Sequence, residues 1–294
     1  MKNQFILTVL LLSFHIASAQ NIFEGVIINK STKVPIPYTS IFLMKGKVGV
    51  NADENGFFKI EITNREIDDS LIITCMGYAP MKFPVQSADK LWSASAKIEL
   101  TELGHNLEEV VVHNNNFKNS ITLNQFDELP GQYYGSGNFI AQLAQHFVSP
   151  SENAILKDIK IAKFNIPILM PQKAIFRIRV YAVDSITKAP SYDLTDEVIE
   201  VKSSSKIVEL NLEKYKIYLP NNEFFIAIEW LRIPYNATET KINGKTVTHY
   251  SPSIGWSKNQ ATKMDIWQLG LNNVWGKFPD YLNSNLAIAV SLKY

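Results

Sequence analysis

The chain has 294 residues, and its 29 lysines and arginines stand against 28 aspartates and glutamates, which gives a formal net charge of +1. A neutral chain without a basic cluster lacks the charge that binds nucleic acid or an anionic membrane surface. The single cysteine, Cys75, lies in the apolar run SLIITCMGY, which predicts a buried thiol rather than a reactive one. One cysteine cannot form a disulfide within the chain, so packing alone must stabilise the fold.

Residues 1–19 have the pattern of a secretory signal peptide. Lys2 precedes an apolar run, and the small residues Ala17, Ser18 and Ala19 then form an A-x-A cleavage site. The apolar run is too short for a membrane span. We therefore expect an exported protein with no transmembrane span in its mature chain.

Most of the remaining periodic segments alternate apolar and polar residues, as half-buried strands do. Examples are GFFKIEI (56–62), AIFRIRVYAV (174–183), EFFIAIEWL (223–231) and LAIAVSLKY (286–294). Turn-forming sequences separate them, which predicts antiparallel β-sandwiches. The segment GNFIAQLAQHF (137–147) leaves helix and strand open, because its large apolar residues recur every four positions.

The stretch NADENGFFKI begins like an EF-hand loop, with Asn51, Asp53 and Asn55 followed by Gly56. Its twelfth position should be a bidentate glutamate, but it is Ile62, and the flanking sequences are not helical. Asn-Gly adopts positive φ at little cost and closes β-hairpins. The sequence therefore favours a hairpin turn over a calcium site.

Residues 23–112 resemble the carboxypeptidase-regulatory-like domain. The resemblance rests on features that occur in order: PIPYTSI (35–41), DENGFF (53–58), SLIITCMGY (70–78) and LEEVVV (107–112). It implies a seven-stranded, transthyretin-like sandwich without catalysis of its own. Such domains accompany exported enzymes and outer-membrane nutrient transporters of Gram-negative bacteria. The resemblance thus implies a location in the periplasm, at the outer membrane or outside a Gram-negative cell.

The amide-rich, mostly polar segment 113–130 predicts a linker after this first domain. Residues 131–294 resemble the jelly-roll half of exported proteins that begin with the same regulatory-like domain, and this half implies no activity. The predicted fold class is therefore all-β. A transthyretin-like sandwich at 20–112 precedes a jelly-roll-like antiparallel β-sandwich at 131–294.

No constellation of catalytic residues stands out in the sequence. His105 and Glu108 have the H-x-x-E spacing of two zinc ligands, with His249 as a distant third, but they lie in the closing segment of the regulatory-like domain. The sequence has no G-x-S-x-G elbow, and its adjacent carboxylates point to opposite faces of a strand. We therefore predict a protein that is not an enzyme and has no metal or cofactor.

Aromatic residues form the one suggestive cluster. Trp230 and Trp267 lie in strand-like patterns that predict core positions, whereas Trp256 and Trp275 lie among glycine and polar residues, as loop residues do. We take Trp256, Trp275 and the nearby Tyr250 as candidate ligand-binding residues, because flat aromatic faces stack on sugars.

Two functions remain open. The first is an exported, non-catalytic, glycan-binding protein that works beside a polysaccharide uptake or degradation system. It predicts that Trp256 or Trp275 lies exposed on a concave face. The alternative is a structural or assembly protein of the cell envelope with an envelope protein as partner. It predicts buried tryptophans and an exposed apolar patch.

Overall fold

The computed structural model describes residues 21–45, 48–62, 69–85, 96–103, 117–126, 131–137, 140–164, 173–257, 265–271, 273–279 and 284–294. The expected signal peptide, the closing LEEVVV motif and the H-x-x-E pair lie outside these residues. Within them the chain folds into strands and two short 3-10 helices, which confirms the all-β prediction. None of the helices in these ranges is long and apolar enough to span a membrane.

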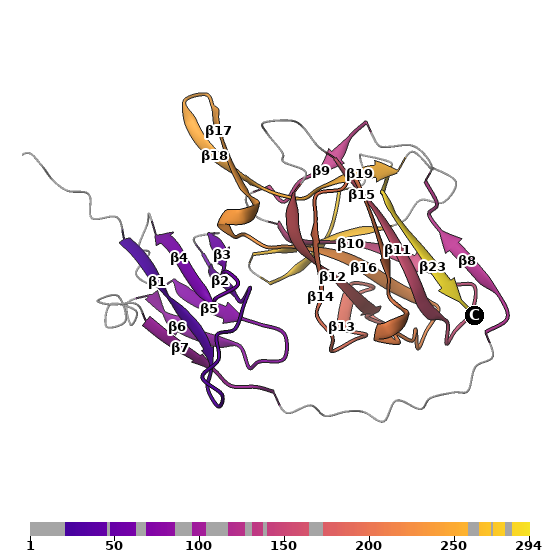
Figure 1. Cartoon of the computed structure of the whole chain (residues 1–294), viewed down its shortest axis with the longest axis horizontal. Helices are drawn as coiled ribbons and strands as arrows, with labels where there is room; N and C mark the ends of the chain where they lie inside the picture. The colour runs from indigo at the N-terminus through magenta and orange to yellow at the C-terminus, as the bar shows by residue number, and fades with distance from the viewer. Residues whose placement is uncertain are drawn as a thin grey trace, which may run out of the picture.

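The first seven strands form two sheets, drawn in indigo and violet in Figure 1. One sheet has the order β4-β1-β7 and consists of β1 (Asn21–Asn29), β4 (Phe57–Ile62) and β7 (Ala96–Leu100). The other has the order β3-β2-β5-β6 and consists of β2 (Ser40–Leu43), β3 (Gly49–Asn51), β5 (Ser70–Thr74) and β6 (Met81–Pro84). Between the two sheets lies a core to which β4 contributes Phe58, Ile60 and Ile62, as its alternation predicted.

The turn at Asn55-Gly56 is real, but the expected hairpin is wrong. Strand β3 pairs with β2 and strand β4 pairs with β1, so the turn carries the chain from one sheet to the other. The carboxylate Oδ1 of Asp53 accepts the backbone N–H groups of Asn55 (2.8 Å) and Phe57 (2.9 Å). Gly56 has φ +72°, so a turn sequence was needed here although the flanking strands do not pair.

The second part of the chain forms two larger sheets that pack face to face. The β12 sheet has the order β13-β12-β16-β10-β20-β21, and β14 also pairs with β12. Its strands are β10 (Ile140–Val148), β12 (Ala174–Val183), β13 (Pro190–Asp193), β14 (Ile199–Ser203), β16 (Glu223–Trp230), β20 (Ile266–Gly270) and β21 (Trp275–Lys277).

The facing sheet is named the β11 sheet and has the order β22-β19-β11-β23-β8, with β15 paired to β11 and β9 to β19. Its strands are β8 (Ser120–Leu123), β9 (Tyr133–Tyr134), β11 (Ile155–Phe164), β15 (Ile207–Asn211), β19 (Ser253–Ser257), β22 (Asn285–Leu286) and β23 (Ile288–Lys293). The 3-10 helices η2 (Glu213–Tyr215) and η3 (Pro234–Asn236) lie in connections. All strand pairs described in this part are antiparallel.

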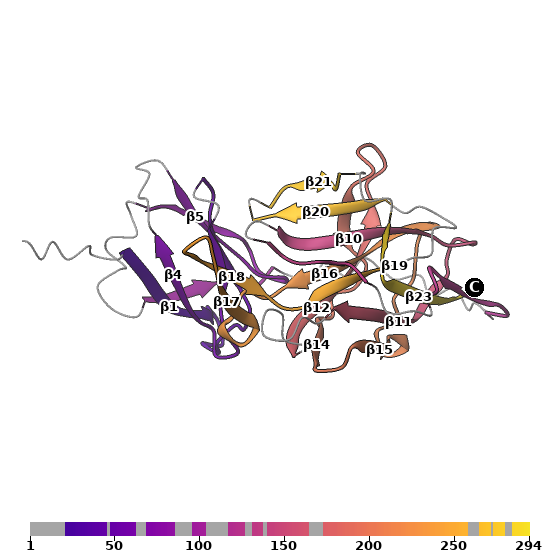
Figure 2. The ribbon, with the colours of Figure 1, turned by 90° about the horizontal axis from the view of Figure 1, so that it is seen from above.

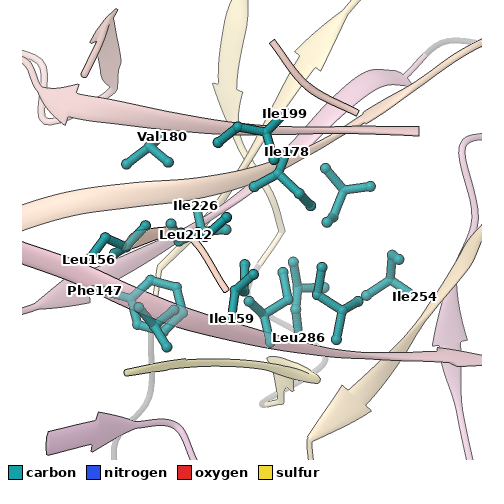
Figure 3. Close-up of a cluster of buried hydrophobic side chains, with 14 of the residues drawn as sticks. Phe147, Leu156, Ile159, Ile178, Val180, Ile199, Leu212, Ile226, Ile254 and Leu286 are labelled. Atoms are coloured by element: carbon teal, nitrogen blue, oxygen red, sulfur yellow. The ribbon is translucent and has the colours of Figure 1, made fainter. Parts of the chain in front are cut away.

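One apolar core fills the space between the β12 and β11 sheets. Figure 3 shows part of it, with Phe147, Ile178 and Ile226 of the β12 sheet gathered with Leu156 and Ile159 of the β11 sheet. These residues are all at most 1% exposed. Because each fully buried apolar side chain contributes about 1.5–3 kcal/mol, this core stabilises the second part without a disulfide.

Two segments are settled by the sheets rather than by their own sequence. Residues 140–148 are strand β10 and not a helix, because β16 and β20 pair with this segment on its two sides. Residues 120–123, expected within a linker, form strand β8 and pair with β23. The hairpin of β17 (Ala237–Ile242) and β18 (Lys245–Tyr250) extends from the larger sheets on the side of the first sandwich (Figures 1 and 2).

Gly25 marks the closest approach between the parallel strands β1 and β7. A Cβ atom at this position would lie 2.4 Å from the carbonyl oxygen of Ala96. We expect Gly25→Ala to lower the free energy of unfolding of the first sandwich by about 1–3 kcal/mol, because the backbone of β7 must move. Urea unfolding followed by circular dichroism measures this change.

The matched control is Gly131→Ala, since an added Cβ there meets nothing within 4 Å. We expect this control to change stability by less than about 1 kcal/mol. If Gly25→Ala unfolds at the same urea concentration as the control, the close parallel pairing of β1 with β7 is wrong.

Candidate functional site

The outer face of the β12 sheet carries a row of polar and aromatic side chains. In β12 the residues Phe176, Ile178 and Val180 enter the core, so Arg177 and Arg179 must point to the opposite face. Register across the sheet places Arg177 opposite Glu229 of β16, and Glu229 opposite Gln142 of β10. The row continues through Leu269 of β20 to Trp275 of β21. The strand order thus brings together side chains from five strands.

An ion-pair network holds the centre of this row. Arg179 donates from Nε to Asp193 Oδ1 at 2.8 Å and from Nη1 to Glu229 Oε2 at 3.2 Å, and its Nη2 also contacts Asp193. Arg177 Nη1 lies 4.0 Å from Glu229 Oε1. Burial disfavours the charged Arg179, but the carboxylates of Glu229 and Asp193 outweigh it and raise the pKa of this guanidinium. Glu229 is therefore shared between two buried arginines.

Tyr181 links this network to the aromatic end of the row. Its hydroxyl donates to Gln142 Oε1 at 2.9 Å, and its ring meets Trp275 edge-on with the centroids 5.6 Å apart. The guanidinium of Arg179 lies over the same ring at 5.5 Å. Burial raises the pKa of the Tyr181 phenol, which keeps it protonated and able to donate.

The first sandwich covers one end of the row. Asn51 of β3 and Arg232, which follows β16, exchange two hydrogen bonds: Arg232 N–H donates to Asn51 Oδ1 (2.8 Å), and Asn51 N–H donates to Arg232 O (3.1 Å). Tyr38 packs with Ile175, Leu231 and Ile233 in a small buried cluster. These hydrogen bonds and apolar contacts hold the first sandwich in place against the second.

Between the two sandwiches lies a cleft of about 380 Å³. Tyr38, Ser40, Asn51, Thr74 and Cys75 line it from the first sandwich, and Gln142, Arg177, Arg179, Tyr181, Glu229, Arg232 and Trp275 are among the residues that line it from the second. Burial raises the pKa of the Cys75 thiol, so this cysteine is protonated rather than a nucleophilic thiolate. The arrangement can bind a polar ligand through charge, amide groups and aromatic faces.

The structure separates the three aromatic residues that the sequence grouped. Trp275 is half-buried and lines the cleft. Trp256 packs against the core of the second part beside Tyr134, with the ring centroids 4.9 Å apart. Tyr250 lies under the guanidinium of Arg232 at 5.1 Å, so it supports a cleft residue without lining the cleft.

Two of the remaining residues singled out in the sequence can also be placed. Trp230 is 2% exposed and donates its indole N–H to Pro252 O at 2.6 Å, as a core residue should. The ring of His249 contacts the hydroxyl of Thr240 within the β17–β18 hairpin. In the described ranges, no three histidine, cysteine, aspartate or glutamate side chains gather where they could hold a metal ion.

The sequence did not single out the polar residues of the cleft as a site. In the sequence, the alternation of residues 174–183 shows only that Arg177 and Arg179 lie on the polar face of a strand. A signal does exist in EFFIAIEWL, where Glu229 is the one carboxylate of the run 224–230, which is buried on both faces. A charge in such a segment needs a partner from another strand, and only the strand order shows which one.

Comparisons with known proteins agree with the fold of the first part. Residues 23–112 match the family model described as the CarboxypepD_reg-like domain, a non-catalytic β-sandwich. No curated protein matches the chain. Among solved structures, the clostridial cysteine protease Cwp84 after propeptide cleavage matches 83% of this chain with 10% identity and a TM-score of 0.37. This chain spans 57% of that protein, and so distant a likeness carries no functional argument.

Replacing the shared carboxylate tests the network. We expect Glu229→Gln to lower the free energy of unfolding by about 3 kcal/mol, because two buried guanidiniums lose part of their counter-charge. The control Glu209→Gln makes the same change in a pair with Lys160 whose glutamate side chain is 70% exposed, and we expect it to cost less than about 1 kcal/mol. Equal unfolding midpoints for the two variants in guanidinium chloride would contradict the network.

Proposed function

We propose that this protein is a non-catalytic binding protein that holds a saccharide in the cleft between its two β-sandwiches. One observation carries the proposal: the cleft combines the half-buried Trp275 with an amide and several charged side chains fixed by one another. Ligand sites of this size are lined by aromatic residues with a few well-placed polar groups.

The aromatic side of the cleft suits the apolar face of a sugar ring. Trp275 lies on the edge strand β21, and its ring is held by the edge-on contact with Tyr181. A ring that is already fixed loses little conformational entropy when a ligand stacks on it. Trp256 is also half-buried, but it packs against the core of the second part and does not line the cleft.

The polar side of the cleft suits sugar hydroxyl groups. Gln142, Glu229 and the two arginines of β12 are planar groups that can donate or accept two hydrogen bonds side by side. Each is at least partly held by another protein group, as in the bond from Tyr181 to Gln142. Adjacent hydroxyl groups of a saccharide can bind side by side to such planar groups.

Several features support binding without catalysis. The CarboxypepD_reg-like domain at 23–112 is not catalytic, and burial keeps the Cys75 thiol protonated. The two carboxylates nearest the cleft, Glu229 and Asp193, are both engaged by Arg179. Engaged carboxylates of this kind are poorly placed to pass protons to a substrate.

The proposal also covers the cellular location of the protein and the boundaries of its two domains. The signal-like residues 1–19 support export to the periplasm, the outer membrane or the exterior of a Gram-negative cell. We propose one unit at 20–112 and a second that begins before the expected residue 131, because strand β8 at 120–123 pairs within its sheet. A glycan is the proposed partner.

Substitution of Trp275 tests the proposal. The full mature chain is screened on a glycan array, and the best saccharide is titrated by calorimetry into wild type and Trp275→Ala. We expect the variant to bind about tenfold more weakly, because a stacked aromatic face contributes about 0.5–1.5 kcal/mol beyond its buried area. Tyr192→Ala is the control, since Tyr192 is 61% exposed and does not line the cleft.

Two results would contradict saccharide binding in the cleft. One is an array without any binder, and the other is a saccharide whose affinity falls equally in Trp275→Ala and Tyr192→Ala. Either result favours the envelope-protein alternative. A cross-linked complex with an outer-membrane protein would then identify the partner.

A further inference from the structure

The cleft carries more positive than negative charge. Among the described residues, its lining includes the guanidiniums of Arg177, Arg179 and Arg232 and one carboxylate, that of Glu229. A second carboxylate, that of Asp193, pairs with Arg179 but does not line the cleft. All three guanidiniums are largely buried, and a buried charge is stable only when it is paired and hydrogen-bonded.

Arg179 donates hydrogen bonds to carboxylates from all three of its side-chain nitrogens, whereas Arg177 donates none within the described part of the chain. The nearest carboxylate oxygen, Glu229 Oε1, lies 4.0 Å from Arg177 Nη1, and the other oxygen of Glu229 already accepts from Arg179. The Nε–H of Arg177 is buried and has no hydrogen-bond partner, although the residue is only 5% exposed. A buried donor without a partner is costly and points to a group that the protein itself does not supply.

Arg232, which also lines the cleft, is incompletely paired as well. Its Nη2 donates to the backbone carbonyls of Gly137 and Ile140, both at 3.1 Å, while its buried Nε–H has no partner. Carbonyl oxygens satisfy N–H groups but do not neutralise the charge. Burial accordingly lowers the pKa of Arg232.

Tyrosine rings cover one face of each of these guanidiniums. Tyr38 lies 5.2 Å from Arg177, and Tyr250 lies 5.1 Å from Arg232. A stacked ring holds the plane of the guanidinium and leaves its N–H edge free. That edge is the part of arginine that binds the two oxygens of a carboxylate or sulfate side by side.

We propose that the cleft selects an acidic saccharide, whose carboxylate or sulfate group binds the guanidinium of Arg177 and lies beside that of Arg232. This inference rests on the proposed function and names the class of its ligand. The anion supplies the counter-charge that the second sandwich lacks, while the rest of the sugar contacts Trp275. Neutral saccharides of the same shape bind more weakly, because their hydroxyl groups can accept hydrogen bonds from the guanidiniums but supply no counter-charge.

The test compares ligands that differ only in charge. Oligogalacturonate and its methyl ester are titrated by calorimetry into the full mature chain, and a sulfated galactan oligosaccharide and its desulfated form make the second pair. We expect the acidic member of at least one pair to bind at least about tenfold more tightly than its neutral form. The pair that shows the difference identifies carboxylate or sulfate as the preferred group, and its affinity should fall as salt is raised.

Variants of Arg177 test whether this residue causes the preference for acidic over neutral saccharides. Arg177→Gln should reduce the ratio of acidic to neutral affinity to about one. Arg177→Lys should restore part of the ratio, because it keeps the charge but loses the planar edge. Lys188→Gln is the control for a lost positive charge elsewhere, since the side chain of Lys188 is 61% exposed and lies outside the cleft lining, and it should leave the ratio unchanged.

A second readout does not require a saccharide. Sodium sulfate and sodium chloride are compared at equal ionic strength by their effect on the melting temperature of wild type and Arg177→Gln. We expect sulfate to raise the melting temperature of wild type more than that of the variant, because only wild type keeps the anion site.

The outcomes separate the two proposals. If acidic and neutral forms bind equally, the preference for anions is wrong and saccharide binding stands. If no saccharide binds but sulfate acts only on wild type, saccharide binding is wrong and the anion site stands. If sulfate acts equally on both proteins and no pair shows a charge preference, the anion site is overturned.

Discussion

The carboxylate of Glu229 is the interaction on which the cleft depends. Glu229 lies in strand β16, whose side chains are buried on both faces of the sheet. Its carboxylate is shared by Arg177 and Arg179. Two guanidiniums cannot remain buried beside each other without such a counter-charge. The sharing also leaves Arg177 incompletely paired, and this incomplete pairing is the basis of the proposed anion site.

The first sandwich lines part of the cleft and also makes hydrogen bonds that fix it against the second sandwich. Its hydrogen bonds from Asn51 to the backbone of Arg232 fix β3 against the chain segment after β16, and Tyr38 covers Arg177. The cleft therefore exists only where both sandwiches are present. The regulatory-like domain thus completes the proposed ligand site, which is one physical reason for it to adjoin a second β-sandwich.

Local pattern predicted the strands β4, β12, β16 and β23 correctly, and it failed where pairing decided the outcome. The alternation in β4, β12, β16 and β23 showed which side chains enter the core, because period two follows from the geometry of an extended chain. The same pattern could not show that Asn55-Gly56 joins two different sheets or that β10 is a strand between two partners. Those facts depend on neighbours far away in the sequence.

The sequence by itself determined the all-β class, the regulatory-like first domain and the division of Phe176, Ile178 and Val180 from Arg177 and Arg179. Each of these follows from contacts within a few residues or from motif order. Only the tertiary structure decided that Trp275 lines the same cleft as the arginines while Trp256 packs against the core. The reason is that strand order and register bring five distant segments side by side, and only there do buried charges find, or lack, their partners.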